Sequence, residues 1–212
     1  MRIFGITYAD GQTTEYEPYR NRAADKTWRF EYNPMIDITD NLVGDMPDDA
    51  LLGILSWKFP QKTGLTRAHL LAALDRAAGA DVVNFTPDVS AWGSFMDSSV
   101  ARHGELLRDL VKACCTHTGM SYVNDPAHVF YSNQFVARKS AYMDYMSNVI
   151  KPSLALLEGP LWAVANQPSG HSGLSPEELK KHTGLAFYNY IPFVLERMVA
   201  QFVHNRRLRL FR

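Results

Sequence analysis

The sequence predicts a three-layer α/β domain, with a mostly parallel central sheet and helices on both of its faces. Residues 51–55 form an aliphatic run of strand length that turns at once into a polar, basic and aromatic loop, which is typical of a buried parallel strand. Residues 51–88 continue as strand, helix and strand, and further strands are expected near Ile3 and Phe130. With 212 residues and no linker-like segment, the chain is expected to form one domain over residues 1–212.

Charge and hydropathy narrow the classes of partner. Lysine plus arginine and aspartate plus glutamate each number 22, so no overall field draws the protein to nucleic acid and any basic site must be local. The apolar part of the N-terminus is too short for a signal peptide, and no apolar run is long enough to cross a bilayer. We therefore expect a soluble, cytoplasmic protein without a nucleic-acid partner.

The first strand, residues 3–8, ends at the turn Asp10-Gly11. Chains that begin with a central strand often bind nucleotides, so Thr7 and Tyr8 are candidates to contact a base. Residues 12–33 are polar and aromatic with no clean period, and we expect an irregular excursion with a role at the site.

An acidic loop, residues 44–49, follows a short helix expected within residues 34–43. Its aspartates invite a metal-site hypothesis. However, Asp48 and Asp49 precede the central strand, which places them at the end of the sheet away from a crevice at the carboxyl ends, so we interpret them as turn residues.

The loop after the central strand carries the clearest binding chemistry. Ligands of open α/β sheets lie outside the carboxyl ends of the strands, where this loop is expected. It offers ammonium groups for anionic oxygens, aromatic rings to cover a flat ring, and hydroxyls, a set that suits a nucleotide or a sugar phosphate. The candidate residues are Ser56, Trp57, Lys58, Lys62 and Thr63, with Phe59 as a second ring. The alternative is that the rings belong to the core and the lysines are solvated.

The helix after this loop is expected to begin at Thr66 as N-cap and to end at Gly79. A right-handed crossover makes the two flanking strands parallel and brings their carboxyl ends to one edge. Asn84 and Asp88 are therefore expected at the same edge as the Ser56 loop, and Asp88 is a candidate catalytic carboxylate.

Residues 98–116 have the spacing of an amphipathic helix, and His117 near its end is interpreted as a group that compensates the helix dipole. Cys114 and Cys115, the only cysteines, are adjacent and cannot form a disulfide framework or a metal knuckle. We expect both to be small buried residues.

Residues 129–137 predict another strand, interrupted by Ser132 and Asn133. A buried amide needs a hydrogen-bond partner, and for Asn133 the partner is either a ligand or a backbone group.

Three features in the last third of the chain bear on function: a loop that suits a lid, a glutamate in a helix, and a group of arginines. Residues 159–175 are rich in proline and glycine and suit a mobile lid. Within a final helix over about residues 186–204, Glu196 lies among apolar residues, where it is either a general base or half of a buried ion pair with Lys58, Arg138 or another cation. Four arginines near the end of the chain form a local basic cluster that could bind a phosphate, a lipid head group or a partner. They are Arg206, Arg207, Arg209 and Arg212.

These motifs together resemble the glycosyltransferase-like domains of bacterial capsule and O-antigen gene clusters. The shared order is a Gly-x-x-Ser-x-Lys-Phe-x-x-Lys-Thr-Gly loop, an Asp-Val-Val-x-Phe-x-Pro strand, an Asn-x-Phe-Val-Ala-Arg-Lys strand and a Leu-Glu-Arg helix. The matching residues are Gly53, Ser56, Lys58, Phe59, Lys62, Thr63, Gly64, Asp81, Phe85, Pro87, Asn133, Phe135, Val136, Lys139, Glu196 and Arg197. The resemblance implies a GT-A-like fold, a nucleotide-sugar donor and a glycan acceptor.

Two departures limit what the resemblance carries over. A related group has His-Tyr-Arg-Arg-Tyr-Phe where this chain has Ser-Trp-Lys-Phe-Pro, so its histidine and arginine roles do not transfer. Many GT-A enzymes hold Mn²⁺ or Mg²⁺ with an Asp-x-Asp motif, which is not evident after the Asp81 strand; Lys58 and Lys62 are then the candidates to neutralise a diphosphate. Besides a glycosyltransferase, a non-catalytic nucleotide or carbohydrate module and a protein-interaction domain stay open.

Overall fold

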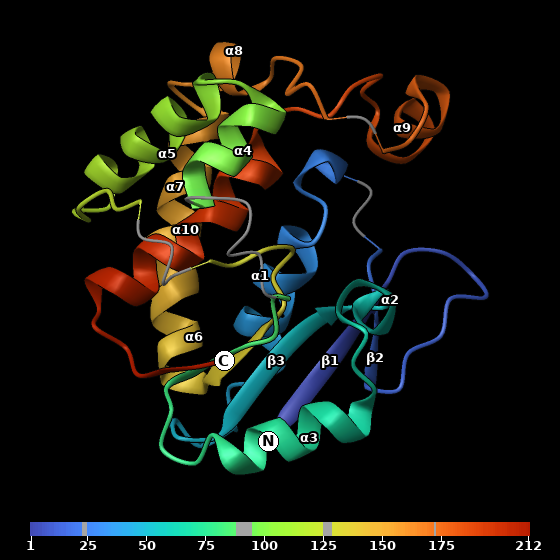
Figure 1. The fold of residues 1–212 in the computed structure, drawn as a ribbon. Helices are drawn as coiled ribbons and strands as arrows, with labels where there is room; N and C mark the ends of the chain where they lie inside the picture. Colours follow the sequence, from blue (N-terminus) through green and yellow to red (C-terminus); the bar gives the residue numbers. More distant parts are fainter. Residues whose placement is uncertain (23–24, 88–94, 125–128, 172) are drawn as a thin grey trace.

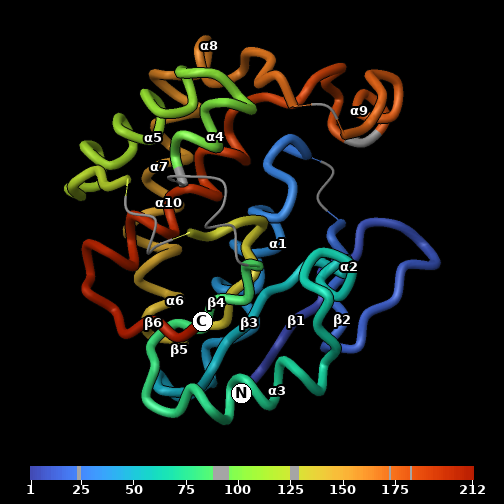
Figure 2. Tube along the Cα trace, viewed as in Figure 1, coloured from blue at the N-terminus to red at the C-terminus, as the bar shows by residue number. Residues whose placement is uncertain are grey.

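The computed structural model of the chain describes residues 1–22, 25–87, 95–124, 129–171 and 173–212, and its centre is a six-stranded sheet (Figure 1). The strands are β1 (Arg2–Thr7), β2 (Glu17–Arg20), β3 (Leu51–Ser56), β4 (Val82–Asn84), β5 (Phe135–Arg138) and β6 (Leu210–Phe211). Their order across the sheet is β2-β1-β3-β5-β4-β6. Figure 2 labels all six strands along the chain trace.

The sheet is mostly parallel, as the sequence predicts. β1 pairs in parallel with both β2 and β3, and β4 pairs in parallel with β6. β5 runs antiparallel to its two neighbours, β3 and β4, so β3 and β4 themselves point the same way. The carboxyl ends of β1, β2, β3 and β4 and the start of β5 therefore share one edge of the sheet.

Helices cover both faces of the sheet (Figure 1). Their bounds are η1 (Thr27–Arg29), α1 (Tyr32–Asn41), α2 (Phe59–Thr63), α3 (Arg67–Arg76), α4 (Phe95–His103), α5 (Leu106–His117), α6 (Lys139–Tyr145), the π-helical turn η4 (Met146–Ile150), α7 (Lys151–Glu158), α8 (Trp162–Ala165), α9 (Pro176–Thr183) and α10 (Ile191–Asn205). Helices α4, α5, α7 and α8 group at the top of the view, away from the start of β1.

Two hydrophobic cores lie on the two faces. Alternate residues of β3 divide between them, with Leu52 and Ile54 in the larger core and Leu55 in the smaller. The larger core also takes residues from α1, α6, α5 and α10, whereas the smaller is closed by Leu70 and Leu74 of α3. This alternation is the period-two pattern of a strand buried on both sides.

Several local predictions are confirmed. Thr66 caps α3 by accepting a hydrogen bond from the His69 backbone N–H at 3.3 Å. Cys114 and Cys115 are buried, and burial raises the pKa of each thiol to about 12, as expected of inert small residues. Asp48 and Asp49 lie in the turn before β3, at the edge opposite the strand's carboxyl end. Within the described ranges no helix is long and apolar enough to span a bilayer.

Other predictions were wrong in position or direction. The strand expected near Phe130 begins only at Phe135 and is antiparallel, because Ser132 and Asn133 adopt left-handed φ values of 55° and 52° that form a turn ahead of it. The helix expected over residues 98–116 is two helices, α4 and α5, separated at Gly104, which has a φ of 88°. Residues 12–33 are not wholly irregular, since they contain β2 and η1, and the last helix begins only at Ile191.

Candidate functional site

Polar residues that the sequence assigns to separate strands meet at the carboxyl edge of the sheet. Thr7 ends β1, Ser56 ends β3, Asn84 ends β4, and Asn133 lies just before β5. All four are buried. Backbone hydrogen bonds hold the ends together, from Trp57 N–H to the Ile6 carbonyl at 3.0 Å and from Phe85 N–H to the Gln134 carbonyl at 2.8 Å. The predicted edge therefore exists, with β5 inserted between the β3 and β4 ends.

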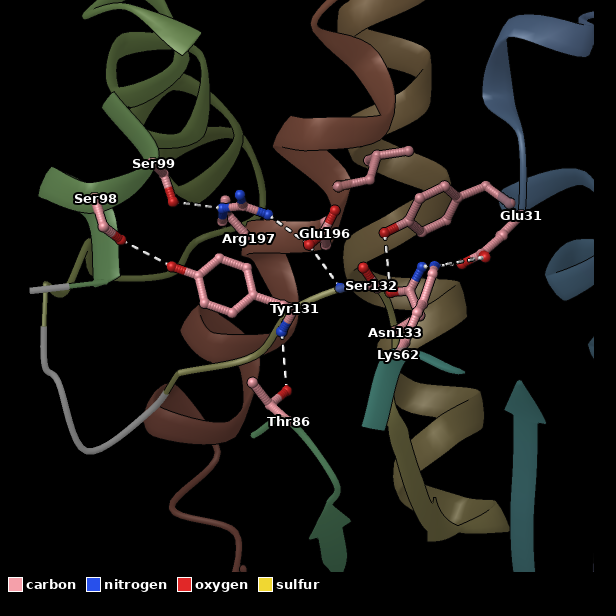
Figure 3. Close-up of polar contacts among 12 residues, drawn as sticks. Glu31, Lys62, Thr86, Ser98, Ser99, Tyr131, Ser132, Asn133, Glu196 and Arg197 are labelled. Carbon is pink, nitrogen blue, oxygen red and sulfur yellow. Dashed lines mark hydrogen bonds and ion pairs between the residues drawn. The ribbon is translucent and has the colours of Figure 1, made fainter. Parts of the chain in front are cut away.

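The Asn133 amide is fixed by two side chains from the start of α1 (Figure 3). The Tyr32 hydroxyl donates to Asn133 Oδ1 at 3.1 Å, and Asn133 Nδ2 donates to Glu31 Oε2 at 3.2 Å. Both of these partners are side chains, so the backbone group that the sequence offered as an alternative to a ligand is not among them.

Glu31 is a site residue that the sequence does not single out. Its second oxygen, Oε1, lies 3.9 Å from Lys62 Nζ. Burial raises the pKa of Tyr8 well above its ordinary value, and the negative charge of Glu31 adds to that rise. Glu31 precedes α1 but makes no capping hydrogen bond, so its carboxylate serves Asn133 and Lys62 instead. It lies in the aperiodic stretch 12–33, where only a helix-initiation signal could have found it.

Glu196 approaches the same turn from α10. The Ser132 backbone N–H donates to Glu196 Oε1 at 2.6 Å, and Arg197 Nη1 lies 2.8 Å from the same oxygen (Figure 3). The ion-pair partner is therefore the next residue in the chain. Glu196 does not pair with Arg138 or Lys58. Arg138 pairs with Asp81, and the ammonium of Lys58 lies over the Trp57 ring.

Arg197 connects this carboxylate to two further elements. Its side chain is buried, its Nε donates to Ser99 Oγ of α4 at 2.8 Å, and its guanidinium lies 5.0 Å from the centre of the Tyr131 ring. The Tyr131 backbone N–H donates to Thr86 Oγ1 at 3.0 Å, just beyond β4. Figure 3 shows the resulting polar chain from Ser99 through Glu196 and Ser132 to Asn133 and Glu31.

The turn at Ser132 and Asn133 allows the Glu196 and Glu31 carboxylates to accept hydrogen bonds from two consecutive residues of the chain. A left-handed conformation costs roughly 1–2 kcal/mol for a residue other than glycine. With consecutive φ values of 55° and 52°, the chain directs the Ser132 N–H toward Glu196 and the Asn133 amide toward Glu31. Strain of this kind is found preferentially at functional sites.

Not every predicted residue joins this cluster. Lys58 is exposed and its Nζ lies 5.3 Å from the centre of the Trp57 ring, so the Lys58 and Trp57 pair borders the edge without contacting Asn133. The Ser56 hydroxyl accepts from the Lys58 N–H at 3.3 Å, and the Thr63 hydroxyl donates to the Phe59 carbonyl at 2.8 Å within α2. Phe59 is buried in the smaller core, so it cannot cover a ligand.

Both ends of the Asn84 amide form hydrogen bonds with backbone groups. Its Nδ2 donates to the Val129 carbonyl at 2.6 Å, and its Oδ1 accepts from the Thr86 N–H at 2.9 Å. Thr7 likewise has a backbone partner, the Tyr19 carbonyl at 3.4 Å. Asp88 lies outside the described residues.

Two histidines, His103 and His171, pack against Phe193 on the same helix as Glu196. Burial, with Arg197 and His171 nearby, lowers the pKa of His103 to about 4. Burial and the charge of Arg102 also lower the pKa of His171, against the opposing effect of Glu196. Both imidazoles are therefore neutral at pH 7.

An open cavity of about 640 Å³ lies at the carboxyl end of β2, beside the start of α1. Its lining is polar and partly cationic and consists of Pro18, Tyr19, Arg20, Asn21, Arg22, Asn33 and Asp37. Because Arg20 pairs with Thr7 across the sheet, the cavity lies beside the end of β1.

The described residues do not fit a divalent cation. Glu31 faces Lys62 and Asn133, whereas Glu196 faces Arg197 and an N–H group, so each carboxylate already has positive or donor partners. In the part of the chain that the structure describes, no three histidine, cysteine, aspartate or glutamate residues gather closely enough to hold a metal ion.

Comparison of the chain with protein-family models, with curated proteins and with solved structures finds no match in any of the three.

Proposed function

We propose that the protein is a glycosyltransferase that moves a sugar from a nucleotide-sugar donor to a polysaccharide or other glycan acceptor. The observation that carries the proposal is the pair of carboxylates, Glu31 and Glu196, held by adjacent residues at the carboxyl edge of a mostly parallel sheet. Ligands of α/β sheets bind at this edge. The resemblance of the sequence motifs to GT-A-like domains supports the same assignment.

The donor is assigned to the β1 and β3 side of the site. Thr7 ends β1 and Tyr8 follows it, and Trp57, whose backbone N–H donates to the Ile6 carbonyl, offers a part-exposed ring for a nucleoside. Lys62, which faces the Glu31 carboxylate that also holds Asn133, and the exposed Lys58 supply positive charge for a diphosphate. Stabilising the charge that develops on the leaving diphosphate is the main catalytic task of such groups.

The proposed reaction needs one base. An acceptor hydroxyl oxygen forms a bond to the anomeric carbon of the donor sugar, while the bond from that carbon to the diphosphate breaks and its electron pair leaves with the nucleoside diphosphate. The hydroxyl proton passes to the Glu196 carboxylate, which Ser132 and Arg197 hold in place through Oε1. Glu31 orients Lys62 and Asn133 toward the donor.

A non-catalytic nucleotide or carbohydrate module is the second candidate. It is favoured by the ion pair itself, because a carboxylate bonded to Arg197 and Ser132 also has a sufficient structural role. Turnover separates the two candidates.

The test is release of nucleoside diphosphate from UDP-, GDP-, CDP- and dTDP-sugars by wild type and by Glu196→Gln. Loss of a general base lowers turnover by about 10²- to 10⁴-fold. Because Arg197 loses its counter-charge, we expect Glu196→Gln also to lower the melting temperature, so turnover is compared below the melting transition of both proteins.

Ser99→Ala is the matched control, since it weakens the anchor of Arg197 and leaves the carboxylate in place. We expect this variant to be less stable and still active. If wild type consumes no donor, or if Glu196→Gln turns over like Ser99→Ala, the protein is not a glycosyltransferase that uses Glu196.

A further inference from the structure

Four aromatic rings from three separate stretches converge near the two carboxylates, and we call Phe30, His171, Tyr188 and Phe193 the aromatic platform. Phe30 stacks on Tyr188 with ring centres 5.7 Å apart and planes inclined by 21°. His171 meets Tyr188 edge-on at 4.7 Å and lies 5.1 Å from Phe193. The rings therefore form one contiguous group.

The platform is not explained by burial of apolar surface. All four side chains are partly exposed. Phe193 packs against the larger core, but Phe30 and Tyr188 belong to neither core. A stacked pair of aromatic rings held outside the cores, at partial exposure, is more typical of a binding surface than of a structural one.

The backbone holds Phe30 on this surface at a cost. Its φ of 49° and ψ of −115° lie in a region that residues with a side chain rarely adopt. The adjoining helix η1 is fixed from the opposite direction, because Arg29 and Lys26 pair with Glu158 of α7 and Trp28 packs on Trp162 of α8. The strained position is thus imposed by the surroundings and presents the Phe30 ring to Tyr188.

The platform adjoins the proposed catalytic groups. Phe30 directly precedes Glu31, and Phe193 lies about one helical turn before Glu196 on α10, with both α10 side chains partly exposed. Helix α10 contacts η1, and the His171 ring lies 5.1 Å from the Phe193 ring of α10. A molecule resting on the rings would therefore lie against α10, which carries Glu196, and against the residue that leads into Glu31.

Gly173, in the segment before α9, lies close to the Tyr188 hydroxyl and to His171. A Cβ at Gly173 would lie 3.1 Å from the Tyr188 hydroxyl oxygen and 3.2 Å from His171 Nε2, so the backbone of this segment approaches both rings closely. The Ser169 N–H also donates to the Tyr188 carbonyl at 2.8 Å. The predicted lid segment is therefore in contact with the platform.

We propose that the aromatic platform binds a pyranose ring of the glycan acceptor, with the apolar C–H face of the sugar on Phe30 and Tyr188 and its hydroxyl groups toward His171 and Glu196. Aromatic faces are electron-rich and match the weakly positive C–H bonds of a sugar, while the few polar groups at the margin set its orientation. This assignment rests on the proposed function, because it places the acceptor beside the base.

The test is saturation-transfer NMR with the methyl pyranosides of glucose, galactose, mannose, N-acetylglucosamine and rhamnose. At least one of them should receive saturation from wild type. Phe30→Gly removes a ring while accepting the left-handed φ, and Tyr188→Leu removes its stacking partner. Each should weaken binding by about tenfold, as loss of an aromatic contact implies.

Two controls keep the result specific. Tyr188→Phe retains the ring and should retain binding, and Tyr122→Leu removes a part-exposed ring whose cation partner is Lys112, outside the platform. If no glycoside binds wild type, or if a bound glycoside is unaffected by Phe30→Gly and Tyr188→Leu, the platform is not a sugar site.

Titration of the same variants with UDP, GDP, CDP and dTDP separates this inference from the proposed function. Nucleotide binding without glycoside binding overturns the platform and leaves the donor site intact. Glycoside binding that depends on the two rings, without binding of any nucleotide, supports the platform and overturns the glycosyltransferase assignment.

Discussion

At Glu196, a carboxylate that the sequence places on a buried helix meets the guanidinium of the next residue and a backbone N–H from Ser132. Helical periodicity could not reveal this arrangement, because adjacent helical residues point in different directions and Ser132 is 64 positions away in sequence. The left-handed turn at Ser132 and Asn133 directs the Ser132 N–H toward the Glu196 carboxylate. The sequence therefore indicated Glu196 as a candidate site residue, whereas its hydrogen-bond and ion-pair partners depend on the tertiary structure.

His103 gives the folded protein a predicted dependence on pH. Its side chain is only 4% exposed, and its pKa falls from 6.5 to about 4 through burial, the neighbouring Arg197 and His171, with Glu196 opposing them. Between these pH values the unfolded chain binds a proton that the folded one does not. Stability is thus complete above about pH 6.5 and decreases toward pH 4, by a total on the order of 3 kcal/mol.

Chemical denaturation of wild type and His103→Phe across this pH range measures the effect. Phenylalanine keeps a flat ring against Phe193, whose centre lies 4.2 Å from that of His103, but it does not titrate. The variant should have a smaller slope between pH 6.5 and 4, and the part of the slope that comes from His171 should remain. Equal slopes in the two proteins would show that His103 is protonated in the fold as easily as in the unfolded chain.

At the scale of elements, β1, β3, α3 and β4 were predictable because each follows a strong local pattern. The strand–helix–strand order of β3, α3 and β4 also correctly predicted that Ser56 and Asn84 share an edge. β5 was misplaced because its apolar run begins before the turn at Ser132 and Asn133, and hydropathy alone does not reveal a turn made without glycine or proline.

The short edge strands were beyond sequence reasoning for a different reason. β2 has a mostly exposed pattern and contains Pro18, and β6 spans only Leu210–Phe211. Such strands are defined by the neighbour they pair with and not by their own periodicity. The same holds for Glu31, whose role depends on Asn133 and Lys62 reaching it from other parts of the chain.

Gly53 in the middle of β3 tests how tightly the sheet packs. A Cβ there would lie 2.9 Å from Val136 Cγ2 and 3.2 Å from Ile3 Cγ2, on the strands to either side. We expect Gly53→Ala to lower the free energy of unfolding by about 1–3 kcal/mol, the usual range for overpacking. Chemical denaturation measures the change.

A second substitution makes that prediction specific. Val136→Ala removes the methyl group in conflict, so the double variant Gly53→Ala, Val136→Ala should lose less stability than the sum of the two single changes. Additive losses, or a Gly53→Ala variant as stable as wild type, would mean that the sheet has room at this position.

At the scale of the whole molecule, basic and acidic residues balance, so any attraction of an anionic ligand is local. The chain carries 22 basic and 22 acidic residues, so attraction of a diphosphate depends on individual side chains at the sheet edge. Two of the C-terminal arginines are occupied within the chain, since Arg206 pairs with Asp144 and Arg209 with Asp81. These pairs weaken the case for a peripheral membrane contact through this cluster, which stays a prediction, as does the cytoplasmic location.

The most direct test of the donor site is isothermal titration of wild type, Lys62→Met and Lys180→Met with UDP, GDP, CDP, ADP and dTDP. Lys62 lies beside Glu31 at the sheet edge, whereas Lys180 is an exposed lysine of α9 that serves as the charge-matched control. We predict that at least one nucleoside diphosphate binds, that Lys62→Met weakens it by about tenfold or more through loss of a charged contact, and that Lys180→Met does not change it. Absence of binding by every nucleotide, or equal affinities for wild type and Lys62→Met, would contradict the assignment of this edge to a nucleotide-sugar donor.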